Sequence, residues 1–213
     1  MGIVNNGQKL PDGEKTIGHM FRDAGYKTGY IGKWHICHEL IVPKEERSGY
    51  DYWLGANTLE SCSDDYKTVL FDDDGNEVFL PGYRVDAETD AAIRFVDDNK
   101  DQPFFLFLSF LEPHFQNHRD DYPAPEGYEE TYQNYWIPPD LRALGGSSAG
   151  HLPGYYGMIK RLDEALGRLR DALRSLNLLE DTIIVFTSDH GCHFKTRNSE
   201  YKRTAHDASC RIP

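Results

Sequence analysis

The sequence predicts an α/β protein, in which a mixed and mainly parallel β-sheet is covered by helices on both faces. Helical segments with one apolar face alternate along the chain with short apolar runs typical of buried strands. Polar residues that could carry chemistry follow directly after these runs. The chain has 213 residues, 39% of them hydrophobic and 27% charged, which suffices for one soluble domain with a sizeable core.

Three segments have the pattern of helices. Residues 15–24 form a short one that ends at Gly25, a common helix stop. Residues 84–99 have an apolar face at helical spacing, and residues 155–176 repeat apolar residues at that spacing with charged residues on the other side. The intervening residues 117–153 are rich in Pro, Gly, Tyr and Asp, which predicts a long irregular excursion.

Five segments have the pattern of strands. Residues 26–31 form the first, and residues 67–71 and 77–80 flank an acidic, glycine-containing loop as a hairpin. Residues 104–110 and 182–187 are continuous apolar runs too short for helices. We expect both to be strands that are buried on both faces.

The composition argues against several classes of protein. A formal net charge of −12 is unfavourable for a nucleic-acid partner, because phosphate binding needs clustered Lys and Arg. No apolar run approaches the ~20 residues that cross a bilayer, so no membrane partner is expected. No signal peptide follows Met1. The four cysteines have neither CxxC nor zinc-ribbon spacing, and we expect unpaired thiols.

Polar side chains follow three of the predicted strands. Lys33 and His35 come after the strand at residues 26–31, and His114 comes after the strand at residues 104–110. Asp189 and His190 come after the strand at residues 182–187. Ligands of open α/β sheets bind outside the carboxyl ends of the strands. We therefore expect these residues to gather along one rim of the sheet.

Each of these motifs alone has an equally good structural explanation. Asp189 and His190 supply an oxygen and a nitrogen donor suited to a divalent cation, but a loop Asp also caps helices and a His is common at the surface. Lys33 and Lys202 taken singly are solvated charges, and His114 is a structural histidine at a strand end. Only the set taken together favours a site.

In chain order, four motifs together resemble those of the type I sulfatases, the formylglycine-dependent enzymes of the alkaline-phosphatase-like superfamily. Residues 25–35, which end in Gly-Lys-Trp-His, closely resemble the second sulfatase signature. Residues 103–114, a strand ending in Glu-Pro-His, resemble the strand that delivers an active-site histidine. Residues 187–191 (Thr-Ser-Asp-His-Gly) are similar to the distal metal motif, and residues 202–213 to the stretch with the last catalytic lysine.

The resemblance implies a role for each residue. Lys33 would contact the sulfate oxygens, and His35 would orient the nucleophile. Lys202 and His114 would stabilise the leaving group or protonate it, with His114 preferred as the general acid because an imidazole can be tuned to release a proton near neutrality. The cation that the family uses is Ca²⁺.

The metal site and the nucleophile are incomplete relative to the family. Asp189 and His190 would be two of the calcium ligands, but the family's early Asp-Asp pair is absent. No cysteine begins the Cys/Ser-x-Pro-x-Arg motif that yields formylglycine. Both features belong upstream of residues 4–7, and the family continues beyond Pro213 into a C-terminal subdomain. The resemblance thus implies that residues 1–213 are a partial catalytic domain, truncated at both ends.

The implied function is that of a sulfuric ester hydrolase acting on sulfated small molecules or carbohydrates. A phosphonate or phosphodiester hydrolase of the same superfamily is one alternative, and a catalytically inactive remnant is another. Cellular location stays open, because family members are often periplasmic, secreted or lysosomal. We also expect the chain alone to have an exposed sheet edge and to aggregate readily.

Overall fold

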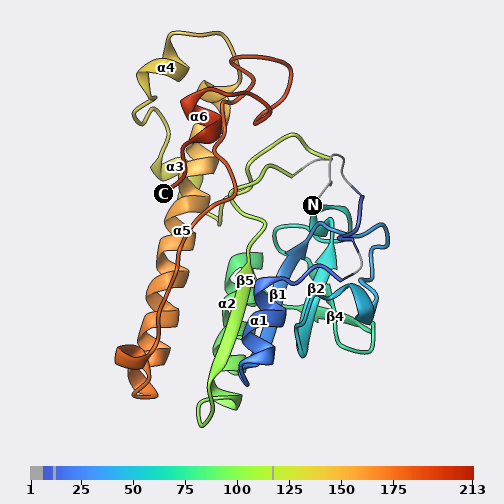
Figure 1. Ribbon diagram of the computed structural model, residues 1–213. Helices are drawn as coiled ribbons and strands as arrows, with labels where there is room; N and C mark the ends of the chain where they lie inside the picture. Colours follow the sequence, from blue (N-terminus) through green and yellow to red (C-terminus); the bar gives the residue numbers. More distant parts are fainter. Residues whose placement is uncertain (1–6, 12, 117) are drawn as a thin grey trace.

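The computed structural model describes residues 7–11, 13–116 and 118–213 (Figure 1). Residues 4–6, which resemble the stretch after the sulfatase nucleophile motif, lie outside the described residues. The sheet has five strands in the order β4-β3-β2-β1-β5. They are β1 (Lys27–Trp34), β2 (Tyr52–Asn57), β3 (Thr68–Phe71), β4 (Glu77–Leu80) and β5 (Phe104–Ser109). β1 pairs in parallel with β2 and β5, whereas the β2–β3 and β3–β4 pairings are antiparallel, so the predicted mixed sheet is confirmed.

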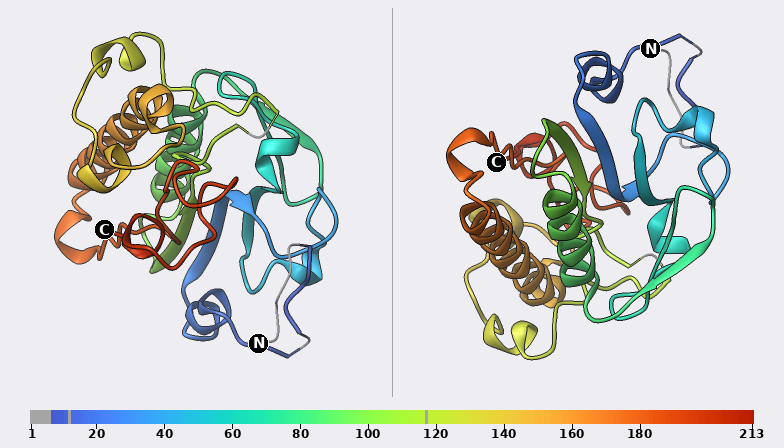
Figure 2. Two further views of the ribbon diagram at one scale, coloured as in Figure 1. Left: turned by 90° about the horizontal axis from the view of Figure 1, so that it is seen from above. Right: turned by 90° about the horizontal axis from the view of Figure 1, so that it is seen from below.

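Helices cover both faces of the sheet (Figure 2). α1 (Ile17–Asp23) packs on one face of β1, α2 (Arg84–Asp98) packs on the other, and the long α5 (Ser148–Ser175) lies outside α2. Three further α-helices are single turns: α3 (Tyr128–Thr131), α4 (Pro139–Arg142) and α6 (Asp207–Cys210). Three 3₁₀ turns are η1 (Lys44–Glu46), η2 (Leu59–Ser61) and η3 (Leu179–Asp181).

Alternating side chains of β1 build a separate core on each face, because successive residues of a strand point in opposite directions. Ile31 is fully buried in the cluster that includes Phe95 of α2. Tyr30 points the other way and stacks on Trp53 of β2, with ring centroids 5.0 Å apart. β1, which pairs with a strand on each edge, is therefore also covered on both faces.

The two runs predicted to be buried on both faces are not, and that prediction is wrong. Among the described residues β5 pairs only with β1, and Phe107 is 42% exposed. Residues 182–187 form no strand at all, and Ile183 is 91% and Val185 80% exposed. Apolar composition indicates a preference for burial, but burial itself requires neighbouring segments. Among the described residues β5 has one neighbouring strand and residues 182–187 have none.

The other differences concern element boundaries. β1 continues through Trp34, and β2 was not predicted. The predicted irregular excursion contains α3, α4 and the first turns of α5, whose glycines weaken the helical pattern. Contacts explain two of these glycines: a Cβ on Gly154 would lie 2.1 Å from the Tyr122 carbonyl oxygen, and one on Gly157 would lie 2.6 Å from Ala124. The excursion packs directly on the α5 backbone at these points.

Two expectations from composition can be compared with the structure. In the part of the chain that is described, no helix is long and apolar enough to cross a membrane. All four cysteines are free, as expected.

The exposed side chains of residues 182–187 should make the chain self-associate. Replacing Ile183 and Val185 by Glu removes two large apolar side chains from the surface, each of which gains about 1.5–3 kcal/mol when buried. The apparent dissociation constant should rise by at least about tenfold in light scattering over a concentration series. The control pair, Gln133→Glu with Ser175→Glu, adds the same charge elsewhere and should change the dissociation constant little. Equal changes for both pairs would contradict self-association through residues 182–187.

Candidate functional site

The first element of the site is Lys33, which lies near the carboxyl end of β1. Its position depends on Gly32, which has a φ of +106°, and a Cβ there would lie 2.1 Å from the Ser109 carbonyl oxygen of β5. Glycine therefore permits the close approach of β1 and β5 at this end of the sheet. Lys33 Nζ is 3.0 Å from Glu60 Oε1, and the two side chains are only 14% and 4% exposed.

The second element is a contact between His114 and Lys202. His114 follows β5 in a turn, and its Nε2 is 3.3 Å from Lys202 Nζ. Because a lysine ammonium has only donors, Nε2 must accept this hydrogen bond. Nδ1 then carries the proton and donates to the Phe115 carbonyl oxygen, 2.7 Å away. The backbone therefore selects one tautomer of a neutral imidazole.

Positive charge is concentrated around these groups. Burial, Lys33 and Lys202 together lower the pKa of His114 to about 4. Burial lowers the pKa of Lys202, and the nearby positive charge of Lys33 lowers it further. The same two causes, in the same order, lower the pKa of His35. Although burial opposes the effect, Lys33 holds the pKa of Glu60 below its usual value. Groups that disfavour one another's protonation in this way form a site suited to an anion.

The third element is the segment that follows residue 187. Seen from above, it loops over the carboxyl ends of β1 and β5 (Figure 2, left). Its turn is tight at Gly191, whose N–H donates to the Ser209 carbonyl oxygen at 2.7 Å and where a Cβ would lie 2.3 Å from the Ala208 carbonyl oxygen. The Asp189 carboxylate opposes the lowering of the pKa at both His35 and Lys202, so it is within electrostatic range of both.

Asp189 and His190 fit part of a metal site. The Asp189 side chain is 84% exposed, and its Oδ2 lies 3.3 Å from His190 Nε2, so one oxygen and one nitrogen donor are adjacent. Calcium takes six to eight oxygen ligands, which leaves most of a coordination shell to other groups. The chemistry of the pair suits a cation held jointly with further carboxylates.

The described residues bring three ligand atoms together elsewhere, at Cys37, Glu39 and Glu46. Burial raises the pKa of the Cys37 thiol to about 11, and the thiol donates to the Glu39 carbonyl oxygen at 3.0 Å. A protonated, hydrogen-bonded thiol is a poor metal ligand. This group is therefore a weaker metal candidate than Asp189 with His190.

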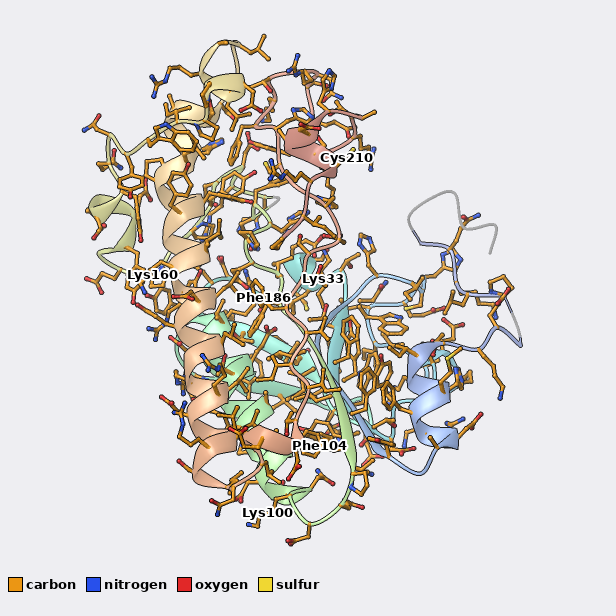
Figure 3. All side chains as sticks on the ribbon, turned by 60° about the vertical axis from the view of Figure 1, so that its left-hand side comes forward. Lys33, Lys100, Phe104, Lys160, Phe186 and Cys210 are labelled. Carbon is orange, nitrogen blue, oxygen red and sulfur yellow. The ribbon has the colours of Figure 1, made fainter. Side chains whose placement is uncertain are left out.

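A pocket of about 390 Å³ opens beside the site. Its lining includes His35 and Glu60, together with Asn57 and Thr58 at the end of β2. The pocket is thus continuous with the Lys33 neighbourhood. Figure 3 shows Lys33 at the upper end of the sheet, below the segment that carries Cys210, whereas Lys100 lies at the opposite end.

The structure brings together most of the residues singled out from the sequence. Lys33, His114 and Lys202 act on one another electrostatically, and His35 and Asp189 lie within range. Sequence reasoning missed Glu60, the partner of Lys33. The apolar run of β2 could have indicated Glu60, because Glu60 follows the carboxyl end of β2 just as His114 follows that of β5.

The fold and site define an α/β protein with a mixed sheet and a cluster of lysine and histidine at the carboxyl ends of its parallel strands. The family model described as Sulfatase matches residues 1–213. The chain belongs to the sulfatase family. Its fold is that of the alkaline-phosphatase-like sulfatases, as its structural neighbours indicate.

Three similar proteins illustrate the match. The ulvan-active sulfatase of Formosa agariphila is 34% identical over 227 residues, which cover 100% of this chain and 42% of that protein. The crystal structure of yidJ from Bacteroides fragilis, described as a sulfatase, has a TM-score of 0.81 at 26% identity, covering 96% of this chain and 50% of that one. Ps i-CgsB in complex with k-i-k-neocarrahexaose has a TM-score of 0.70 at 25% identity, covering 98% and 48%. The chain thus spans about half the length of these proteins.

The pKa of His114 should respond to its lysine neighbours. Lys202→Met removes one of the positive charges that lower it, so the pKa should rise from about 4. Titration of the imidazole carbon-bound protons by NMR measures this directly. Lys100→Met removes an equal charge at the opposite end of the domain and should leave the value unchanged. A His114 pKa that is the same in Lys202→Met and in the unsubstituted chain would show that the two side chains do not interact.

Proposed function

We propose that Lys33, His35, His114 and Lys202 form part of the active site of a sulfuric ester hydrolase. The observation that carries the proposal is the contact of His114 Nε2 with Lys202 Nζ at 3.3 Å, beside the buried Lys33. These side chains come from three separate parts of the chain and meet at the carboxyl ends of parallel strands. The residues proposed to bind an anionic group thus lie at the rim where ligands of open α/β sheets bind.

The reaction explains why positive charge is concentrated there. When a sulfate ester is hydrolysed, negative charge develops on the sulfuryl oxygens and on the leaving-group oxygen. Lys33 contacts the sulfuryl oxygens, and Lys202 lies where it can stabilise the leaving group. Both ammonium groups are fixed before substrate arrives, so little reorganisation is needed in the transition state.

His114 is the proposed general acid, although it is neutral in the free chain. Burial, Lys33 and Lys202 together hold its pKa at about 4. An anionic sulfate ester bound between the two lysines offsets their charge and raises the pKa of His114. The imidazole then takes up a proton from solvent at Nε2, which gives up the hydrogen bond that it accepts from Lys202 Nζ, and can pass that proton to the leaving-group oxygen.

The nucleophile is not supplied by the residues of this chain. In the family it is a hydrated formylglycine, which provides a covalent route for the sulfuryl group. His35 lines the pocket next to Glu60 and is the residue proposed to orient that nucleophile. Burial and Lys33 lower the pKa of His35, which favours the neutral form that accepts a hydrogen bond.

Membership of the sulfatase family indicates a metal cofactor, and we propose Ca²⁺. Asp189 would supply a carboxylate oxygen, and His190 the neighbouring donor, as part of a shell completed by other carboxylates. A cation there would stabilise the developing negative charge together with the lysines.

The proposed substrates are sulfated carbohydrates. Two similar proteins support this class: one is named for its activity on ulvan, and Ps i-CgsB was crystallised with neocarrahexaose. Phosphonate and phosphate esters present a similar tetrahedral anion, so they are to be tested beside the sulfate ester as alternative substrates.

A chimaera tests the function. This chain replaces the matching segment of the ulvan-active sulfatase, which leaves the remaining segments of that protein in place. The chimaera should hydrolyse an aryl sulfate, lose turnover when Ca²⁺ is chelated, and prefer the sulfate to the matching phosphate and phosphonate esters. His114→Ala or Lys202→Ala should lower kcat at least ~100-fold while changing calcium affinity little. The chain alone should show no turnover.

The outcomes separate the candidate functions. Asp189→Ala in the chimaera should weaken calcium binding in calorimetry, and Lys100→Ala serves as a distant control. A folded chimaera with preference for phosphonate esters would favour the related hydrolase. A folded chimaera that binds calcium but hydrolyses none of the three esters would identify this segment as an inactive remnant.

A further inference from the structure

A buried ionic network lies beneath His114. Arg84, at the start of α2, is fully buried, and its Nε donates to Glu112 Oε1 at 2.9 Å. Its Nη2 is 2.8 Å from the same oxygen. Glu112 is 4% exposed and lies two residues before His114. One end of the His114 turn is therefore fixed to α2 by a charge-assisted contact that excludes water.

Gln116 fixes the other end of the turn. Its side chain is fully buried, and its Oε1 lies 3.5 Å from Arg84 Nη2. Its Nε2 donates to the backbone carbonyl oxygens of Glu60 at 3.3 Å and of Ser63 at 3.0 Å. One amide therefore joins the His114 turn to the segment that carries Glu60, the partner of Lys33.

Within the network, the positive charge of Arg84 is balanced by a single carboxylate, without any contribution from Lys33, Lys202 or Glu60. Burial and the proximity of Glu112 raise the pKa of Glu88 well above its usual value, so Glu88 keeps its proton. Arg84 then pairs with one carboxylate, Glu112. Neither group is free to neutralise Lys33 or Lys202, and the network acts on the site through position.

We infer that Arg84, Glu112 and Gln116 are positioning residues, which set the distance between the His114 imidazole and the Lys33–Glu60 pair. This inference rests on the proposed role of His114, and it adds three residues that contact no substrate. Glu112 lies two residues before His114 and Gln116 two residues after it, and both side chains accept a hydrogen bond from Arg84. The same amide that ends the turn also holds the Glu60 backbone, so the two halves of the site are linked through one side chain.

Breaking the amide link should be visible at His114 in the free chain. Gln116→Met has a similar volume and leaves the Arg84–Glu112 pair in place, but it cannot bond to the two carbonyl oxygens. The His114 turn and the Glu60 segment should then separate, so burial and Lys33, the two largest causes of the low pKa, act less on the imidazole. The smaller, opposite effect of the Glu60 carboxylate is lost with them, so the net pKa should rise. NMR titration should show the pKa of His114 rising from about 4 by more than ~0.5.

A matched control separates positioning from stability. Asn99 is also a buried amide, and its Nδ2 donates to the Phe95 carbonyl oxygen at 2.8 Å. Asn99→Leu should lower the midpoint of thermal unfolding by a comparable amount and leave the pKa of His114 unchanged. If Gln116→Met does not fold, Gln116→Asn keeps an amide in the site with a shorter reach and should shift the pKa in the same direction.

The readouts keep this inference apart from the proposed function. An unchanged His114 pKa in folded Gln116→Met or Gln116→Asn would overturn the positioning role, whatever happens to stability. Inorganic sulfate that fails to shift the His114 signals of the unsubstituted chain would instead count against the proposed function. The titration in the absence of sulfate does not depend on that result.

Discussion

The parallel pairing of β1 with β5 is the constraint on which the rest of the site depends. It places the carboxyl ends of two strands side by side, and each end leads into a residue of the site, Lys33 in one case and His114 in the other. The approach is close enough that only glycine fits at position 32, opposite Ser109. Because β1 is also packed on both faces, the position of Lys33 is set by the whole core.

Concentrating like charges at this rim has an energetic cost that the fold offsets. Burial disfavours the charged forms of His114 and Lys202, and Lys33 disfavours them further. Glu60 compensates by pairing with Lys33, and His114 compensates by remaining neutral. The arrangement that results suits an additional anion, as the proposed binding of a sulfate ester requires.

The sequence predicted the fold class and several of the local elements, but it missed β2 and failed where neighbouring segments decide the outcome. The hairpin around Gly75 and the helix at residues 84–98 follow from local pattern alone. Residues 182–187 carry a strand pattern, but the described residues provide no partner for them. Glu60 escaped prediction because its importance arises from a contact with Lys33, 27 positions away in sequence. Spacing along the chain does not encode such a contact.

In the proposed function, Lys33, Lys202 and His114 together bind one sulfate-like anion. A crystal structure of the chain grown with selenate tests it directly, because the anomalous signal of selenium locates the anion. We expect selenate within ~3 Å of both lysine Nζ atoms and of His114 Nε2. Selenate bound only at surface lysines such as Lys160, with no anion near Lys33, Lys202 or His114, would contradict this proposal.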